Sequence, residues 1–438
     1  MKKLARIFLV LAVVVLLSGC MLTVDEMYRV PKRSDAYHAL QSAVDEAMLG
    51  MSYCAPSSGE NRQTIQIADL DGDGTSEYVL FAKSTEEKPL RIMVFRNQNG
   101  SFVHVDTVEC NGTAFDRVEY VDMDGQPGVE IVIGRQLSDQ VLRSASVYKF
   151  HNNELTQLVG VNYTKLMTVD LDGDNIWELF LLRPGQTDAD VGIAELYRVR
   201  DGVMERYNEA AMSQPAEKIK RIIVGKLDGG KPAVYVASAV DENSLVTDVY
   251  SVYEGKLVNV ALLHKTGTDV KTMRNFYVYA DDIDNDYVIE LPSLIPMKPM
   301  TAGDSIDSHQ LIRWYAMSPE GEEVDKMYTY HNFVDGWYLQ LDSAWSNRLF
   351  VEMADNAYVF YLWDESYKTS EKVFTIYAIT GQNREEQGSV EGKFIIHKTE
   401  SVVYAGRMER NAGDYELTSE LVIDHFRLIQ QEWKTGET

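Results

Sequence analysis

Acidic residues stand at every second position in three short stretches of the chain. The first holds Asp69, Asp71 and Asp73, with Glu77 four residues further on, and the same pattern starts at 170 and at 282. A hard divalent cation such as Ca²⁺ takes six or more oxygen ligands, which four carboxylates, a backbone carbonyl and water can supply. Without a cation, three carboxylates so close together would repel one another. This spacing therefore predicts calcium-binding loops.

Counted from its first Asp, each complete loop offers carboxylates at positions 1, 3, 5 and 9 and a backbone carbonyl at position 7. The predicted ligands are Asp69, Asp71, Asp73, Thr75 and Glu77; Asp170, Asp172, Asp174, Ile176 and Glu178; and Asp282, Asp284, Asp286, Val288 and Glu290. A copy at 122 offers Asp122, Asp124, Gln126 and Glu130, with Gln126 in place of the central carboxylate. A copy at 226 keeps only Asp228, and we expect it to bind no ion. The sequence thus predicts about three to four structural calcium ions.

An EF-hand loop and a metal-free turn are the two alternatives to this interpretation. An EF-hand loop starts in the same way but needs an acidic residue at position 12 and a helix after it. Position 12 is Leu80, Ile133, Leu181 or Ser293, and strand-like residues follow. A metal-free Asp/Gly turn is the other alternative, since such turns are common. Three complete copies in one register favour the metal loop.

The loops recur with a period of about fifty residues. They start at 69, 122, 170, 226 and 282, with spacings of 53, 48, 56 and 56 residues. A short strand-like run precedes each loop, an alternating run follows it, and one or two further strands end at turn signals such as NQNG at 97–100. About four strands per repeat is typical of a β-propeller blade. The expected fold is mainly β, a β-propeller of about five to seven four-stranded blades.

The loops resemble the FG-GAP or VCBS-type repeat, the calcium-loop blade of integrin α-chain propellers and many bacterial surface proteins. That pattern is D-x-D-x-D-G-x-x-D/E, and the resemblance covers about 60–335. The copies at 69, 170 and 282 match every ligand position, whereas the Phe-Gly and Gly-Ala-Pro signatures that name the family are missing. The resemblance implies that each loop joins the first two strands of a blade and that its ion pins the hairpin.

Other elements are expected on both sides of the repeats. Residues 20–59 predict a tether and one helix, "SDAYHALQSAVDEAMLG" at 34–50, which starts at a possible Ser34 cap. Residues 336–438 predict closely spaced antiparallel strands and a helix at 417–433 capped by Thr418. We interpret this part as a small α+β domain; the alternative is two further blades.

The N-terminus predicts a lipoprotein signal peptide over residues 1–19. Lys2, Lys3 and Arg6 precede an apolar run at 7–17 that is too short to span a membrane as an ordinary helix. "LSGC" at 17–20 then resembles a lipobox, in which Cys20 takes the lipid. A plain secretory signal or a short anchor is the alternative. We expect a protein held by its lipid in a bacterial cell membrane and facing outside the cytoplasm.

The net charge bears on the possible partners, and the cysteines bear on a possible disulfide. The formal net charge is −25, and loss of three basic residues with the signal peptide would make it more negative. Such a protein is repelled by nucleic acid, so we expect no nucleic-acid partner. Cys54 and Cys110 could form a disulfide outside the cytoplasm or remain as two buried thiols, and one pair offers no spacing pattern to decide between them.

No catalytic motif stands out in the sequence. G-x-S-x-G, H-E-x-x-H, a P-loop and a dinucleotide fingerprint are all missing, and His425 on the apolar face of the last predicted helix fits a core histidine better than a catalyst. The Trp- and Tyr-rich stretch 314–367 could bind sugar or peptide, but alternating strand core is favoured. We therefore expect a binding module for an extracytoplasmic protein or a cell-wall glycan, not an enzyme.

The alternatives are an enzyme or enzyme accessory acting on cell-wall polymer, and a solute-binding lipoprotein. The second requires a βαβ alternation that the sequence does not show.

Overall fold

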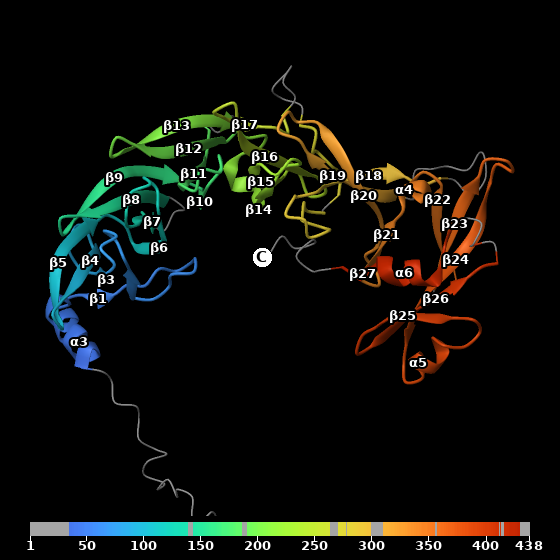
Figure 1. Cartoon of the computed structure of the whole chain (residues 1–438), viewed down its shortest axis with the longest axis horizontal. Coiled ribbons are helices and arrows are strands. Elements are labelled where there is room, and N and C mark those ends of the chain that lie inside the picture. Colours follow the sequence, from blue (N-terminus) through green and yellow to red (C-terminus); the bar gives the residue numbers. More distant parts are fainter. Residues whose placement is uncertain are drawn as a thin grey trace, which may run out of the picture.

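The computed structural model describes residues 35–138, 143–185, 191–262, 270–276, 278–298, 310–354, 357–410, 412 and 416–429. The expected signal peptide and Cys20 lie outside these residues. Over the described residues the chain is mainly β, with six separate antiparallel sheets and a few short helices. The sheets follow one another along an open arc, with the first and the last at its two ends (Figure 1). None of the described helices is both long and apolar enough to cross a membrane.

The first four sheets are built from consecutive strands, in up-and-down order except that β1 and β2 of the first sheet both pair with β3. The first sheet contains β1 (Ser52–Tyr53), β2 (Ile65–Ala68), β3 (Glu77–Lys83), β4 (Leu90–Gln98) and β5 (Ser101–Cys110). The second contains β6 (Ala114–Val121), β7 (Glu130–Gln136), β8 (Arg143–His151) and β9 (Glu154–Tyr163). The third contains β10 (Lys165–Val169), β11 (Glu178–Arg183), β12 (Ile193–Arg200) and β13 (Val203–Ala211). The fourth contains β14 (Ile219–Lys226), β15 (Pro232–Ala239), β16 (Leu245–Tyr253) and β17 (Lys256–Asn259), after the short 3-10 helix η1 (Ala216–Lys218).

Local turn chemistry fixes the hairpins between the third and fourth strands. β4 and β5 are joined by Asn99 and Gly100, which have φ angles of 56° and 90°. β8 and β9 are joined by Asn152 and Asn153, with φ angles of 53° and 65°. Two adjacent residues with positive φ make the tight hairpin turn that matches the twist of the strands. The turn signals read from the sequence therefore mark real hairpins.

The sheets pack face to face, so their middle strands are buried on both sides. In β11, Leu179 and Leu181 join a core cluster with Val132 and Val147 of the second sheet. The alternate residues of β11 join a cluster with the fourth sheet, through Phe180, Leu182, Val234 and Val236. Since side chains alternate along a strand, burial of both faces requires the nearly continuous apolar runs seen in the sequence.

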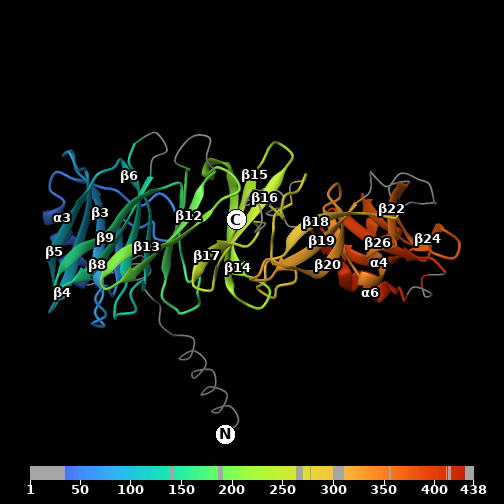
Figure 2. The same cartoon turned by 90° about the horizontal axis from the view of Figure 1, so that it is seen from above.

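Each repeat sheet has a constant orientation in the arc. The first strands β6, β10 and β14 lie on the inner, concave side, and the fourth strands β5, β9 and β13 lie on the outer side (Figure 1). Seen from above, the sheets stand side by side along the long axis of the molecule (Figure 2). The loops between first and second strands therefore recur at equivalent places in successive sheets.

Helix α3 (Asp35–Ala47) covers the free face of the first sheet. Its Val44 is buried against Leu80, Met93 and Phe95, so the end of the array is closed by a helix rather than left as an open apolar face. Both Cys54 and Cys110 are free thiols, and the Cys110 Sγ lies 3.4 Å from the Tyr148 hydroxyl.

The last two sheets differ from the repeats. The fifth contains β18 (Leu291–Pro296), β19 (Gln310–Met317), β20 (Glu323–Asn332), β21 (Trp337–Leu341) and β27 (Phe426–Leu428). The sixth contains β22 (Leu349–Ala354), β23 (Ala357–Asp364), β24 (Thr369–Thr380), β25 (Phe394–Lys398) and β26 (Val402–Met408). The short helices are α4 (Ser343–Ser346), α5 (Arg384–Gln387) and α6 (Ser419–His425).

Two expectations from the sequence, a domain boundary and a helix, concern this C-terminal part. The expected boundary at 335/336 falls between β20 and β21, which pair in one sheet. The expected helix at 417–433 is wrong at Phe426–Leu428, because the chain forms β27 there and pairs with the edge of β21; residues 430–433 lie outside the described residues. Thr418 does cap the helix, accepting a hydrogen bond from the Leu421 N–H. The His425 Nδ1 lies 3.2 Å from the Gln340 carbonyl oxygen.

Six of the Trp and Tyr residues of 314–367 are core residues, as favoured from the sequence. The buried members are Trp314, Tyr315, Trp337, Tyr338, Trp345 and Trp363. Trp337 and Trp345 lie in the cluster shared by the fifth and sixth sheets, and Tyr315 packs against the fourth sheet. These six side chains form no exposed sugar-binding face.

Candidate metal sites and a cleft on the concave side

The acidic loops are turns stabilised by their own first aspartate. In the β2–β3 loop the Asp69 carboxylate accepts hydrogen bonds from the Gly72 and Gly74 N–H groups, at 2.9 and 3.0 Å. The Asp170 and Asp282 carboxylates accept equivalent bonds in their own loops. The aspartates at position 1 thus fix the turn, and the same carboxylates also reach the candidate metal position.

The glutamate at position 9 is buried in every one of the four loops. One of its oxygens, Oε2, accepts a hydrogen bond from the backbone N–H at position 2. The donors are Leu70, Met123, Leu171 and Ile283, at 2.8, 2.8, 2.8 and 3.0 Å. Its other oxygen, Oε1, remains available to a cation.

Four triads of carboxylates result, made by positions 1, 3 and 9. In each, the three ligand atoms lie within 4.8 Å of one another. The triads are Asp69, Asp71 and Glu77; Asp122, Asp124 and Glu130; Asp170, Asp172 and Glu178; and Asp282, Asp284 and Glu290. All donors are oxygens, which suits a hard cation such as Ca²⁺ or Mg²⁺.

The other predicted ligands are not part of the triads. The position-5 carboxylates of Asp73, Asp174 and Asp286 accept the N–H of Thr75, Ile176 and Val288, two residues on. Gln126 donates its backbone N–H to Asp124. In the copy at 226, Asp228 forms a 2.8 Å ion pair with the Lys326 Nζ.

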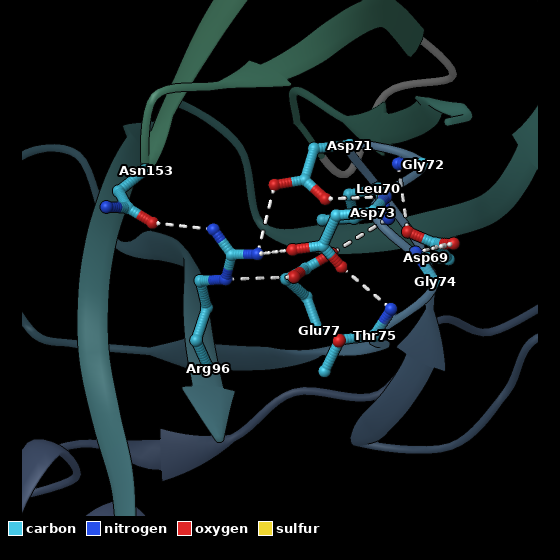
Figure 3. A network of polar contacts seen from close by, with 10 residues as sticks. All are labelled: Asp69, Leu70, Asp71, Gly72, Asp73, Gly74, Thr75, Glu77, Arg96 and Asn153. Carbon is cyan, nitrogen blue, oxygen red and sulfur yellow. Dashed lines mark hydrogen bonds and ion pairs between the residues drawn. The ribbon is translucent and has the colours of Figure 1, made fainter. Parts of the chain in front are cut away.

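In three of the loops a basic residue, which the sequence analysis did not single out, faces the carboxylates. Arg96 on β4 lies 3.1 Å from Asp71 through Nη2 and 3.1 Å from the Glu77 Oε1 through Nε, and it also pairs with Asp73 (Figure 3). Its Nη1 donates to Asn153, from the turn of the second sheet. The guanidinium therefore occupies the space into which the triad points.

The second and third loops have the same arrangement. Lys149 on β8 pairs with Asp124 and lies 3.7 Å from the Glu130 Oε1. Arg198 on β12 lies 2.6 Å from Asp172 and 2.9 Å from the Glu178 Oε1. The signal was present as a basic residue directly after the aromatic of each third strand, in "FRN", "YKF" and "YRV". We call Arg96, Lys149 and Arg198 the internal cations.

The loop at 282 has no residue of this kind on its third strand. Tyr315 pairs with Leu291 as Phe95 pairs with Tyr78, and the residue after Tyr315 is Ala316. The Glu290 side chain is fully buried, and among the described residues its Oε1 has no hydrogen-bond partner. An orphaned buried carboxylate oxygen facing two aspartates fits a bound cation.

Burial raises the pKa of each position-9 glutamate, because the charged form loses solvation. The pKa of Glu178 is raised to about 7, with Arg198 opposing the shift, and that of Glu290 is raised to about 8. Burial likewise raises the pKa of Glu77 and of Glu130. A cation in contact with these carboxylates would reverse the effect.

The loops also connect neighbouring sheets. The Trp177 N–H, in the third loop, donates to the Asp122 carbonyl oxygen at 2.8 Å. Lys226 pairs with Val288, and the Ile289 N–H donates to the Lys226 carbonyl oxygen at 3.1 Å. Order in one loop therefore supports the position of the next sheet.

A cleft of about 470 Å³ opens between the second and third sheets. Its walls come mainly from the first strands β6 and β10, which lie on the concave side of the arc (Figure 1). The lining residues are Gly59, Glu60, Asn61, Arg117, Glu119, Tyr120, Val121, Met167, Thr168 and Trp177.

The cleft combines an exposed aromatic side chain with polar groups. Trp177 is 40% exposed. Glu119 accepts a 2.6 Å hydrogen bond from the Thr168 hydroxyl and lies 3.4 Å from the Arg117 guanidinium. The buried Tyr120 hydroxyl has no hydrogen-bond partner among the described residues. This volume and composition suit a small polar ligand with one flat apolar face.

Comparison of the sequence with protein families and with curated proteins gives no match. Two solved structures that resemble the chain are rhamnogalacturonan lyases. The exotype lyase YesX has a TM-score of 0.27 at 14% identity, over 74% of this chain and 65% of that one. The lyase YesW has a TM-score of 0.30 at 12% identity, over 73% of this chain and 83% of that one.

The similar structures correct one expectation. Both are enzymes, and this finding contradicts the expectation that the chain is not an enzyme. The chain spans less than two thirds of the first lyase.

Proposed function

We propose that this chain is a lipid-anchored, extracytoplasmic protein that is built of propeller-like blades, binds calcium through its acidic loops, and binds a cell-wall glycan on its concave face. The lipobox-like "LSGC" at 17–20 supports the anchor. The oxygen-only triads support calcium, for which the loops would supply Asp and Glu ligands. A bound ion would supply a fixed positive charge that holds each hairpin.

The observation that carries the glycan proposal is the cleft between β6 and β10. A partly exposed indole such as that of Trp177 offers a flat apolar surface for the C–H face of a sugar ring. Glu60, Glu119 and Arg117 offer donors and acceptors for hydroxyl groups beside it. Because the chain is strongly acidic, a neutral glycan suits it better than a polyanion.

Replacing Trp177 with alanine is expected to weaken glycan binding about tenfold or more, because loss of a stacked indole removes roughly 1.5–3 kcal/mol of buried apolar contact. The measurement is calorimetric titration with solubilised cell-wall fragments. Tyr367→Ala is the control, since Tyr367 is 74% exposed on the distant turn between β23 and β24.

Equal affinity of the Trp177→Ala variant and the unchanged protein would overturn the assignment of this cleft. No binding of wall fragments by either, with capture of a protein from membrane extract, would favour a protein partner. Analysis of the same mixtures for shortened glycan fragments would show whether the protein cleaves the glycan.

Calcium is expected to raise the midpoint of thermal unfolding by a few degrees. A site saturated at about 100 times its Kd adds about 2.7 kcal/mol to the folded state. The measurement compares the chain from residue 20, with Cys20 replaced by serine, in excess EDTA and in millimolar calcium. An unchanged midpoint, with no metal found by elemental analysis, would mean that the acidic stretches are only turns.

A further inference from the structure

We propose that the four acidic loops are not equivalent: the loop at 282 is the calcium site, and the loops at 69, 122 and 170 are neutralised by the internal cations Arg96, Lys149 and Arg198. This inference rests on the proposed calcium binding. Of the four candidate sites, one is then open to calcium, and the other three are occupied by a basic side chain of the protein.

The internal cations contact the same carboxylates that a calcium ion would use. Arg96 reaches Asp71 and the Oε1 of Glu77, both members of the first triad (Figure 3). Lys149 reaches Asp124 and Glu130, and Arg198 reaches Asp172 and Glu178, in the second and third triads. Each triad therefore already has a positive charge on two of its three members.

Calcium and an internal cation compete for one position. Calcium sits about 2.3–2.6 Å from its oxygen ligands, which leaves no space for a guanidinium nitrogen about 3 Å from the same oxygens. Binding would first require the arginine to leave buried Glu77 or Glu178. Breaking such a pair is costly, and apparent affinity falls by the fraction of molecules with the arginine displaced.

The loop at 282 holds the same carboxylates without this competitor. Lys326, on β20, is 2.8 Å from Asp228 of the neighbouring loop. It is also 4.0 Å from Asp286, which belongs to the loop at 282 but not to its triad. No ion pair to Asp282, Asp284 or Glu290 is present among the described residues. The buried, unpartnered Glu290 Oε1 is a second and independent sign that a cation belongs there.

The open site lies at a junction between sheets. The loop at 282 precedes β18, and its Val288 and Ile289 pair with Lys226 at the end of β14. Calcium at this loop would therefore order the contact between the fourth and fifth sheets. The junctions between the first three sheets would hold with or without calcium.

The test is calcium titration of the mature chain, by calorimetry and by equilibrium dialysis with calcium alone. The unchanged protein is expected to bind one ion tightly, and Glu290→Gln to lose that site with at least a tenfold drop in affinity. Arg96→Met and Arg198→Met are each expected to gain a second tight site. Arg183→Met is the matched control, because Arg183 pairs with Glu195, away from the loops, and it should still bind one ion.

The outcomes separate this inference from the broader calcium proposal. Four equivalent tight sites in the unchanged protein, or no gain in both Arg96→Met and Arg198→Met, would overturn the inference and leave calcium binding intact. An absence of calcium binding in all variants would overturn the calcium proposal itself. Two independent arginine variants guard against one that fails to fold, which circular dichroism in EDTA would reveal.

Discussion

Replacing Trp337 with alanine is expected to destabilise the protein by about 3–5 kcal/mol, the usual range for loss of a fully buried tryptophan. The Trp337 side chain has no exposed surface and lies in the cluster that joins the fifth and sixth sheets. Its ring stacks on Phe426 at 5.4 Å between centroids and meets Tyr358 edge to face at 5.4 Å. Removal would leave a cavity between β21, β23 and β27.

Chemical denaturation followed by circular dichroism measures this effect. Trp177→Ala is the matched control, because it deletes the same side chain from a partly exposed position in the third loop and should cost much less. A loss below about 1 kcal/mol in Trp337→Ala would mean that the two sheets do not depend on this contact.

The repeat could be predicted from sequence because its signals are local. The sequence of β11 is "ELFLLR", a nearly continuous apolar run typical of a strand buried on both faces. The Asn99–Gly100 pair likewise predicts the tight hairpin turn between β4 and β5. The carboxylates at positions 1, 3 and 9 also follow from spacing, since the turn that brings them together lies within nine residues. The expected four strands are found in the second, third and fourth sheets, whereas the first sheet contains five.

Other features depend on contacts between distant residues. Arg96 faces the first loop only because the register of β3 with β4 puts Phe95 opposite Tyr78, and a basic residue on a strand looks like ordinary surface in the sequence. β27 has helical periodicity, but the open edge of β21 and the buried Phe426 favour a strand. Whether the sheets form a ring or an arc depends on the angles between them, which no local pattern encodes.

Replacing Gly128 with alanine is expected to destabilise the contact between the first two sheets by about 2–5 kcal/mol. Gly128 lies in the second acidic loop with a φ of 104°, which costs a residue with a side chain about 1–2 kcal/mol. An added Cβ would also lie 2.9 Å from the Leu70 carbonyl carbon and closer still to its oxygen. These are backbone atoms of the first loop and cannot turn away as a side chain could, so overpacking adds about 1–3 kcal/mol.

Gly74→Ala separates the two contributions. Gly74 also has a positive φ, 84°, but an added Cβ there would meet nothing within 4 Å, so this variant should lose only the backbone part. The measurement is the free energy of unfolding of both variants in EDTA, where calcium cannot compensate. Equal losses would mean that the first two loops are not interlocked. A larger loss in Gly128→Ala would mean that close backbone contact between the two loops aligns the first two sheets.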